Sequence, residues 1–241
     1  MIVVLFSSSC FAQDSEQQLY DAYLTTNMHV WAEYIDSVNW DTATSDERFL
    51  ILNYEYGYAA HAISIQQEDA QERLQQFEQH LEEHRNAMDP AVYYTYKTGI
   101  CSFKLSLERR HITQQIKGIY NYVDSAMTIN PNEPFVLTMK GNVEFFNPIF
   151  GSKQKALLFY QQADSLYRLQ PAQHAYPRWN HRALQITLVQ SLGKTGQKEA
   201  AIEMCQQILA EEPNFPFIRD IYLPSLLKKE GNRRTIYEVN S

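Results

Sequence analysis

Prolines recur along this chain at an almost constant spacing, and glycines keep step with them. Four prolines, each preceded by an apolar run at helical spacing, stand 41, 40 and 42 residues apart: Pro90, Pro131, Pro171 and Pro213. Three glycines stand 42 residues apart each time: Gly57, Gly99 and Gly141. Two residue types in phase at one period indicate stacked units of similar structure. The chain is therefore expected to bury its core between neighbouring repeats.

The segment 185–214 shows what one unit is. Its first half carries an apolar face and ends at Gly193 and Gly196, where a missing Cβ suits a tight turn. Pro213 ends the second half, because proline disfavours the α conformation in the residue before it. Between these points, apolar residues recur at three- and four-residue spacing, on one helix face: Ala200, Ala201, Met204, Cys205, Ile208 and Leu209. The unit is predicted to be a helical hairpin.

This segment resembles a tetratricopeptide (TPR) repeat. The likeness lies in six residues that have the family's order and spacing: Leu188, Leu192, Gly196, Ala201, Ile208 and Pro213. The upstream units are weaker copies, which lack the family's tryptophan and exceed its usual period of about 34 residues. The resemblance implies a solenoid in which the first helix of each hairpin lines a concave surface. A solenoid of HEAT type has a similar period and is the alternative.

We predict an all-α fold, a TPR-like α-solenoid of stacked antiparallel hairpins in one domain, residues 13–230. Four hairpins are expected, at about 46–88, 91–129, 134–170 and 178–210. A helical extension precedes them from residue 14 to about 37, with a candidate break at 25–27, and Ser45 is the predicted cap of the first hairpin. A capping helix kinked at Pro224 follows at about 216–229, and 231–241 is expected to be a flexible tail.

The first twelve residues have the pattern of a secretory signal peptide. Residues 1–6 are apolar and 7–12 are small and mostly uncharged, so cleavage is expected after Ala12. The positive lead is missing and the apolar run is short, which fits a truncated start. Cys10 is an alternative lipid-attachment site, although no leucine stands three residues before it, and an apolar N-terminus of a cytosolic protein is a further alternative. The protein is predicted to be exported, to the periplasm or cell envelope.

Composition excludes several classes of function. The net charge of −7 is spread along the 241 residues, whereas a nucleic-acid-binding protein needs a basic stripe. No apolar stretch is long enough to cross a bilayer. Cys101 and Cys205 fall at apolar positions of different units, so they are predicted to be free, buried thiols and not part of a disulfide framework.

One short motif has the order of a zinc-peptidase helix, His80-Leu-Glu-Glu-His84. On a helix, His80 and His84 would project from adjacent turns, with Glu83 beside them. However, His84 is in phase with an apolar stripe that includes Phe77, which places it at the edge of the core, and no third ligand is evident. We therefore reject the metal site, expect no cofactor and no catalytic residue, and interpret the charged run 108–111 as a solvated turn.

The predicted function is non-catalytic binding of a protein or peptide through the concave face. In phase with the glycines, nine residues are expected to line a tyrosine-rich groove: Tyr54, Tyr58, His61, Tyr93, Tyr96, Phe103, Asn142, Phe145 and Gln190. Tyrosine combines apolar area with a hydroxyl group, so a glycan or small molecule is the alternative ligand. In a second interpretation the N-terminal helix, with Tyr20, Tyr23 and Trp31, fills the groove, and these aromatic residues are core.

Overall fold

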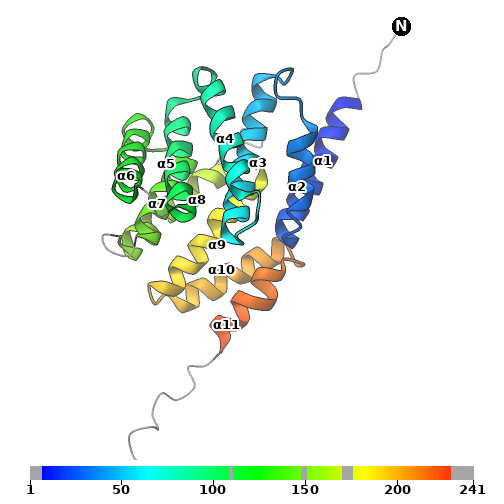
Figure 1. The fold of residues 1–241 in the computed structure, drawn as a ribbon. Coiled ribbons are helices and arrows are strands. Elements are labelled where there is room, and N and C mark those ends of the chain that lie inside the picture. The colour runs from blue at the N-terminus through cyan, green and yellow to red at the C-terminus, as the bar shows by residue number, and fades with distance from the viewer. Residues whose placement is uncertain (1–6, 109–110, 148–150, 170–175, 229–241) are drawn as a thin grey trace, which may run out of the picture. The chain divides into compact units, whose positions relative to one another are not determined.

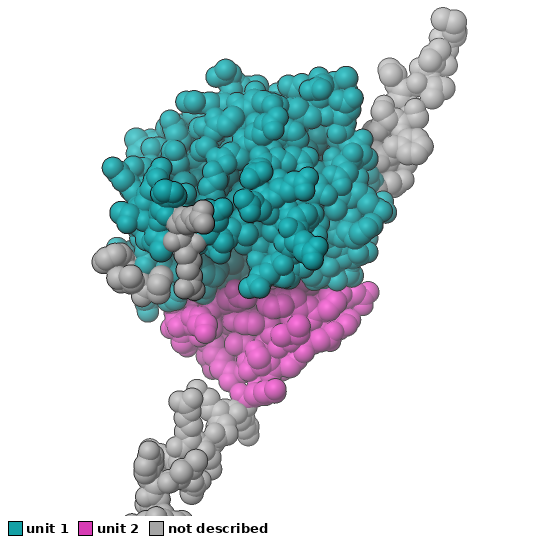
Figure 2. Space-filling model, viewed as in Figure 1, with its two compact units in different colours: residues 1–188 teal, residues 189–241 magenta. Residues whose placement is uncertain are grey.

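The computed structural model describes residues 7–108, 111–147, 151–169 and 176–228, and these are helical, with no β-strand among them (Figure 1). The chain divides into two compact units, residues 1–188 and 189–241, which are coloured separately in Figure 2. The boundary falls inside one helix. The predicted all-α helical-repeat fold is confirmed, and the single domain 13–230 stays a prediction. The N-terminal residues 1–6 and the tail 231–241 lie outside the described residues.

The helices follow one another with short connections. Their order is α1 (Ser7–Thr25), α2 (His29–Ser37), α3 (Ser45–Ser64), α4 (Ala70–His84), a 3-10 turn (Arg85–Ala87), α5 (Pro90–Leu107), α6 (Ile112–Ile129), α7 (Pro134–Phe146), α8 (Lys153–Leu169), α9 (Arg178–Lys194), α10 (Lys198–Glu211), η2 (Phe217–Tyr222) and α11 (Leu223–Leu227).

In the first unit, three hairpins lie side by side. Helices α3 and α4, α5 and α6, and α7 and α8 form the pairs, while α3, α5 and α7 pack against one another in turn. The α1–α2 pair precedes them and packs through α2 on α3. Thr26, with φ of 61°, separates α1 from α2 at the candidate break. Side chains from several of these helices share one apolar core, which contains Leu52, Leu74, Phe77, Leu81, Met88, Val92, Tyr93, Tyr96, Ile100 and Phe135.

Local sequence explains where the hairpins begin. Thr44, and not the predicted Ser45, caps α3, because its side chain and that of Glu47 form a reciprocal capping box. Pro90 is the first residue of α5, where a missing amide hydrogen costs nothing, and the Asp89 carboxylate accepts from the amide of Ala91 at 2.7 Å. The periodic proline thus starts a helix here as well as ending the one before it.

The periodic glycines have a packing function. In each of the three, a Cβ atom would meet an aromatic ring of a neighbouring element, at 2.6 Å for Gly57 and 2.7 Å for Gly99. The rings belong to Trp31 beside Gly57, Tyr56 beside Gly99 and Tyr160 beside Gly141. Because glycine has no side chain, a ring can lie directly on the helix backbone. The repeat signal in the sequence therefore marks places where a helix admits an aromatic side chain.

Substituting Gly141 by alanine is expected to destabilise the first unit, because overpacking a dense core costs about 1–3 kcal/mol. Alanine regains about 1 kcal/mol through its higher helix propensity in α7, so the expected net loss is up to about 2 kcal/mol. Tyr160 cannot move freely, because it is fully buried and its hydroxyl donates to Asn142 Oδ1 at 2.8 Å. Urea unfolding would measure the effect, with Gln161→Ala on exposed surface as the control. Equal or greater stability of the glycine variant would contradict this account.

The second unit is small. Helix α10 packs against η2 and α11, and the Tyr222 hydroxyl donates to the carbonyl oxygen of Val189 at 3.3 Å. The predicted capping helix differs from expectation, because Phe217–Tyr222 is a π-helix and α11 begins just before Pro224. Proline in the first turn of a helix removes no hydrogen bond, so Pro224 is tolerated where the chain changes helix type. The kink at Pro224 stays a prediction. Gly196 has φ of 80° in the predicted turn.

Candidate functional site

The aromatic residues predicted to line a groove lie mostly inside the protein. Five are buried, with exposed fractions of 6% or less: Tyr54, Tyr58, Tyr93, Tyr96 and Phe145. His61, Phe103 and Asn142 are half-buried, and so is Gln190 in the second unit. This is the arrangement expected of core aromatic residues, and a groove lined by them stays a prediction. A ligand surface must be sought where side chains reach solvent.

The hydroxyl groups of two of the buried tyrosines have partners inside the protein. The amide of Asn53 donates to the Tyr96 hydroxyl at 3.1 Å, and the amide of Gln67 donates to the Tyr58 hydroxyl at 2.9 Å. Tyr96 also meets Phe77 edge to face, with ring centroids 5.4 Å apart. Buried polar atoms that are satisfied in this way stabilise the interior and leave little for a ligand to bind.

Helices α2 and α9 both contact α3, the first helix of the first hairpin. Trp179 of α9 lies 5.1 Å from Trp31 of α2 between ring centroids, and both rings lie against the position of Gly57 in α3. One turn later, the buried guanidinium of Arg182 donates to the Tyr20 hydroxyl of α1 at 3.0 Å. The N-terminal helices and the first turns of α9 therefore cover this part of the face that was predicted to be open.

The rejected zinc motif is covered by an aromatic ring. Trp40 stacks on His80, with centroids 4.0 Å apart, and its edge faces His84 at 6.2 Å. His84 is 4% exposed, at the predicted edge of the core. Glu83 accepts a hydrogen bond from the Trp40 indole at 2.6 Å. Within the described part of the chain, no group of three or more His, Cys, Asp or Glu side chains could hold a metal ion.

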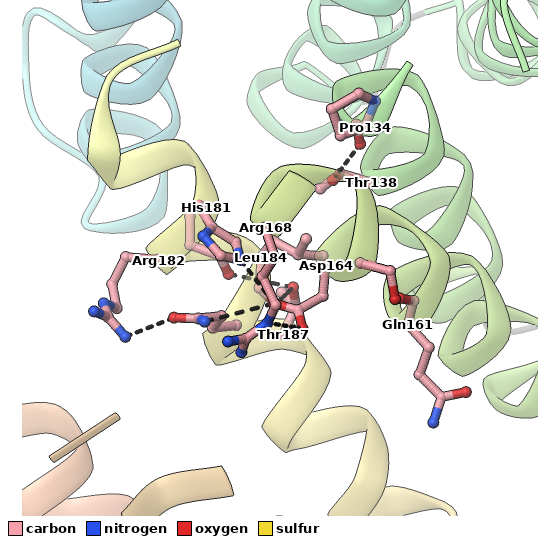
Figure 3. A network of polar contacts seen from close by, with 12 residues as sticks. Pro134, Thr138, Gln161, Asp164, Arg168, His181, Arg182, Leu184 and Thr187 are labelled. Carbon is pink, nitrogen blue, oxygen red and sulfur yellow. Dashed lines mark hydrogen bonds and ion pairs between the residues drawn. The ribbon is translucent and has the colours of Figure 1, made fainter. Parts of the chain in front are cut away.

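A polar network that the sequence did not reveal joins α8 to α9 (Figure 3). The Asp164 carboxylate accepts from His181 Nε2 at 2.7 Å, from Arg168 Nε at 2.8 Å and from Gln185 Nε2 at 3.5 Å. Gln185 in turn accepts from Arg182 Nη1 at 2.6 Å. Burial alone would raise the pKa of Asp164, but the hydrogen bonds from His181 and Arg168 together hold that pKa below its usual value. The network ties two helices together.

Exposed apolar side chains lie along the edge formed by α6 and α7. Ile112 and Ile116 are 44% and 41% exposed, and Tyr120 follows one turn later on the same side of α6. The Tyr120 hydroxyl accepts from the side-chain amide of Asn147, which directly follows Phe146, a residue 64% exposed. We call Ile112, Ile116, Tyr120 and Phe146 the apolar edge. Contiguous exposed apolar residues mark interaction sites, and this set was not among the predicted site residues.

The remaining sequence predictions concern single features. Cys101 and Cys205 are free and buried, as predicted. Among the described helices, none is both long and apolar enough to cross a bilayer. Cys10 lies within α1, and its proposed lipid attachment and the cleavage after Ala12 stay predictions. In the charged run 108–111, Arg109 and Arg110 are outside the described residues, while His111 is exposed at the start of α6.

Comparison with known proteins indicates a fold. No family model matches the sequence, and no curated protein matches it. Among solved structures, the chain is similar to the HusA haemophore from Porphyromonas gingivalis, with a TM-score of 0.59 and 14% sequence identity. The match covers 80% of this chain and 97% of that chain. At this identity the likeness shows a shared helical fold.

Proposed function

We propose that this protein is a non-catalytic binding protein, exported from the cytoplasm, whose ligand is a small, flat and largely apolar molecule. Haem is the first ligand to test. The observation that carries the proposal is the apolar edge, in which Ile112, Ile116 and Phe146 are exposed and Tyr120 is half-buried between them and the core. The likeness in fold to a haemophore supports the choice of ligand.

The chemistry of the apolar edge suits a planar ring system. Covering apolar surface releases about 25 cal/mol for each Å² removed from water, so a large flat ligand gains most from a surface of this kind. Phe146 can contact a ring face, and the two isoleucines supply apolar contact beside it. Lys117, which is exposed and follows Ile116, supplies a positive charge near the edge for an acidic ligand substituent.

A protein or peptide partner is the second candidate. Ile112, Ile116 and Tyr120 recur every four residues, which is the spacing with which one amphipathic helix contacts another. Binding through the concave tyrosines has less support, because five of the predicted contact residues are buried. The two candidates share the apolar edge, so the same substitutions test both.

The test uses two substitutions on the apolar edge, Ile116→Asp and Phe146→Asp. Haem titration followed by visible absorbance should show saturable binding by the unaltered protein and a loss of affinity of at least about tenfold in each variant, since a charge in an apolar contact costs more than about 1.4 kcal/mol. Ile129→Asp is the matched control, because Ile129 is 48% exposed at the other end of α6. It should bind like the unaltered protein.

Three outcomes separate the hypotheses. Absence of saturable haem binding by the unaltered protein would contradict the proposed ligand class. Equal loss in the Ile129→Asp control would contradict the proposed place of binding. Capture of one envelope protein by the unaltered chain and the control, but not by the Ile116→Asp variant, would favour the protein partner over the flat ligand.

A further inference from the structure

Trp40 closes over the first hairpin from the connection between α2 and α3. Its ring lies flat on the imidazole of His80, at 4.0 Å between centroids and 6° between planes. The indole Nε1 donates to Glu83 Oε2 at 2.6 Å, and the Trp40 ring packs beside the apolar core of this unit. The guanidinium of Arg48 lies 5.2 Å from the ring centre on α3. A short connection is thus held by one half-buried side chain.

Beneath this ring lies a buried acid–base pair. His80 Nδ1 is 2.7 Å from Glu55 Oε1, and Glu55 is only 4% exposed. The other carboxylate oxygen, Oε2, is buried and has no hydrogen-bond partner in the described structure. A buried carboxylate with one unsatisfied oxygen is costly when ionised and unpaired. Burial raises the pKa of Glu55, and the contact with His80 only partly opposes that rise.

The other charges around the pair do not replace His80 as the partner of Glu55. On Glu55, Arg73 acts as a cation and Asp36 as an anion. Arg73 is already bound by the carboxylates of Asp36 at 2.9 Å and Asp69 at 3.2 Å.

On the side of Trp40, the charged and titratable groups are Arg48, Glu83 and His84. Arg48 donates to the backbone carbonyls of Trp40 and Asp41. Glu83 accepts from the indole and from Gln79, and buried His84 faces the edge of the ring. Whether the buried Glu55–His80 pair has a net charge therefore depends on whether it carries a proton.

We infer that Glu55, His80 and Trp40 form a proton-controlled latch, which holds the connection 38–44 closed while the Glu55–His80 pair carries one proton and loosens it when that proton leaves. The protonated pair is either neutral acid beside neutral imidazole or carboxylate beside imidazolium, with no net charge in both forms. Loss of the proton to solvent leaves a buried carboxylate beside a neutral ring. In the carboxylate–imidazolium form, the cation also lies against the face of Trp40, which favours closure.

The direction with pH follows from proton linkage. Above the pKa of free imidazole, about 6.5, the closed form holds a proton that the opened form, with its solvated carboxylate and imidazole, releases. Closure therefore weakens as pH rises above that value through the range in which the pair loses its proton. Below about pH 4.3 the opened form binds a second proton, so closure weakens there as well. Because a single proton is involved, the opening equilibrium changes by at most about tenfold for each pH unit. This latch lies on α3 and α4, and it does not depend on the proposed ligand or on the apolar edge.

Hydrogen exchange at residues 38–44, corrected for the intrinsic pH dependence of exchange, measures opening directly. We expect opening in the unaltered protein to increase by about tenfold or more between pH 5.5 and pH 9. Glu55→Gln preserves size and removes the buried carboxylate, so its opening should no longer increase as pH rises. His80→Gln leaves Glu55 as the only proton carrier of the pair, so its opening should still depend on pH, with a profile displaced from that of the unaltered protein. The difference in tryptophan fluorescence between the unaltered protein and Trp40→Phe should follow the same pH profile.

The control is Glu83→Gln, which weakens the hydrogen bond to Trp40 without touching the buried pair. It should raise opening at every pH and leave the pH dependence intact. Opening that is independent of pH in the unaltered protein would overturn the latch. The latch would equally be overturned if Glu55→Gln and His80→Gln both folded and both kept the original pH dependence.

Discussion

Replacing Trp31 by alanine is expected to cost the first unit about 3–5 kcal/mol, the range for deleting a large aromatic side chain from a core. Trp31 is fully buried, and its ring centroid lies 4.9 Å from Tyr54, 5.1 Å from Trp179 and 5.9 Å from Tyr23. Its indole Nε1 also donates to the buried carbonyl of Leu19 at 2.7 Å. Leu19 lies inside α1, so its carbonyl keeps its helical partner when that donor is lost, and the hydrogen bond adds about 0.5–1.5 kcal/mol to the cost.

The loss is large compared with the usual stability of a domain, about 5–15 kcal/mol. Urea unfolding followed by far-ultraviolet circular dichroism would measure it. Trp31→Phe separates the two contributions, because phenylalanine keeps most of the ring contacts and removes only the hydrogen bond to Leu19. A loss below about 1 kcal/mol for Trp31→Ala would show that the N-terminal helices contribute little to the core, in conflict with the packing seen here.

Much of the fold could be predicted because hairpin signals are local. Apolar spacing, capping residues and turn glycines act within a few positions, and α6 ends at Ile129, where the second hairpin was expected to end. The errors are also local. Thr44 and Ser45 can both cap a helix, and the return contact from Glu47 decides for Thr44. The π-helix before Pro224 has no such short-range signal, because it depends on how the last turns pack on α10.

The sequence could not predict whether the tyrosine-rich face is open to solvent or covered by other helices. Its exposure depends on residues far away in the chain. Gly57 was predicted to set the phase of an open groove, yet Trp31 and Trp179 lie against it. Those two tryptophans come from segments that flank the hairpins on either side. A helical stripe of aromatic residues looks the same in sequence whether a ligand or another helix covers it. The structure shows that helices cover the part around Tyr54.

The apolar edge had a signal in the sequence that was easily taken for core. Ile112, Ile116 and Tyr120 are spaced like a buried stripe, but the buried positions of α6 are Val123 and Ala126, on a later part of the helix. The first turns of α6 therefore carry apolar side chains, Ile112 and Ile116, that remain exposed.

The polar network around Asp164 is expected to give the second large effect. Asp164→Ala removes the acceptor that His181, Arg168 and Gln185 share, so these donors must turn to water or remain unsatisfied. The Asp164 side chain is 14% exposed, which keeps solvent screening low. We expect a loss of about 2–3 kcal/mol at neutral pH, between the values for an ordinary hydrogen bond and for a fully buried ion pair.

The matched control is Asp124→Ala. Asp124 also joins two neighbouring helices through a cation, Lys140 at 2.9 Å, but its side chain is 63% exposed. Exposed pairs of this kind contribute about 0–1 kcal/mol, so this variant should differ little from the unaltered protein. The comparison isolates burial, since both substitutions remove an aspartate that bridges consecutive helices.

The effect of Asp164→Ala should also depend on pH in one direction. The pKa of Asp164 is lowered in the folded protein, so its carboxylate adds stability above the unfolded pKa of about 3.9, and that stability is lost as pH falls through the folded value. The difference between the variant and the unaltered protein should therefore be full at pH 7 and shrink below about pH 4. A difference that stays constant from pH 7 to pH 3 would mean that the side chain acts through packing alone, and that its charge does not hold α8 to α9.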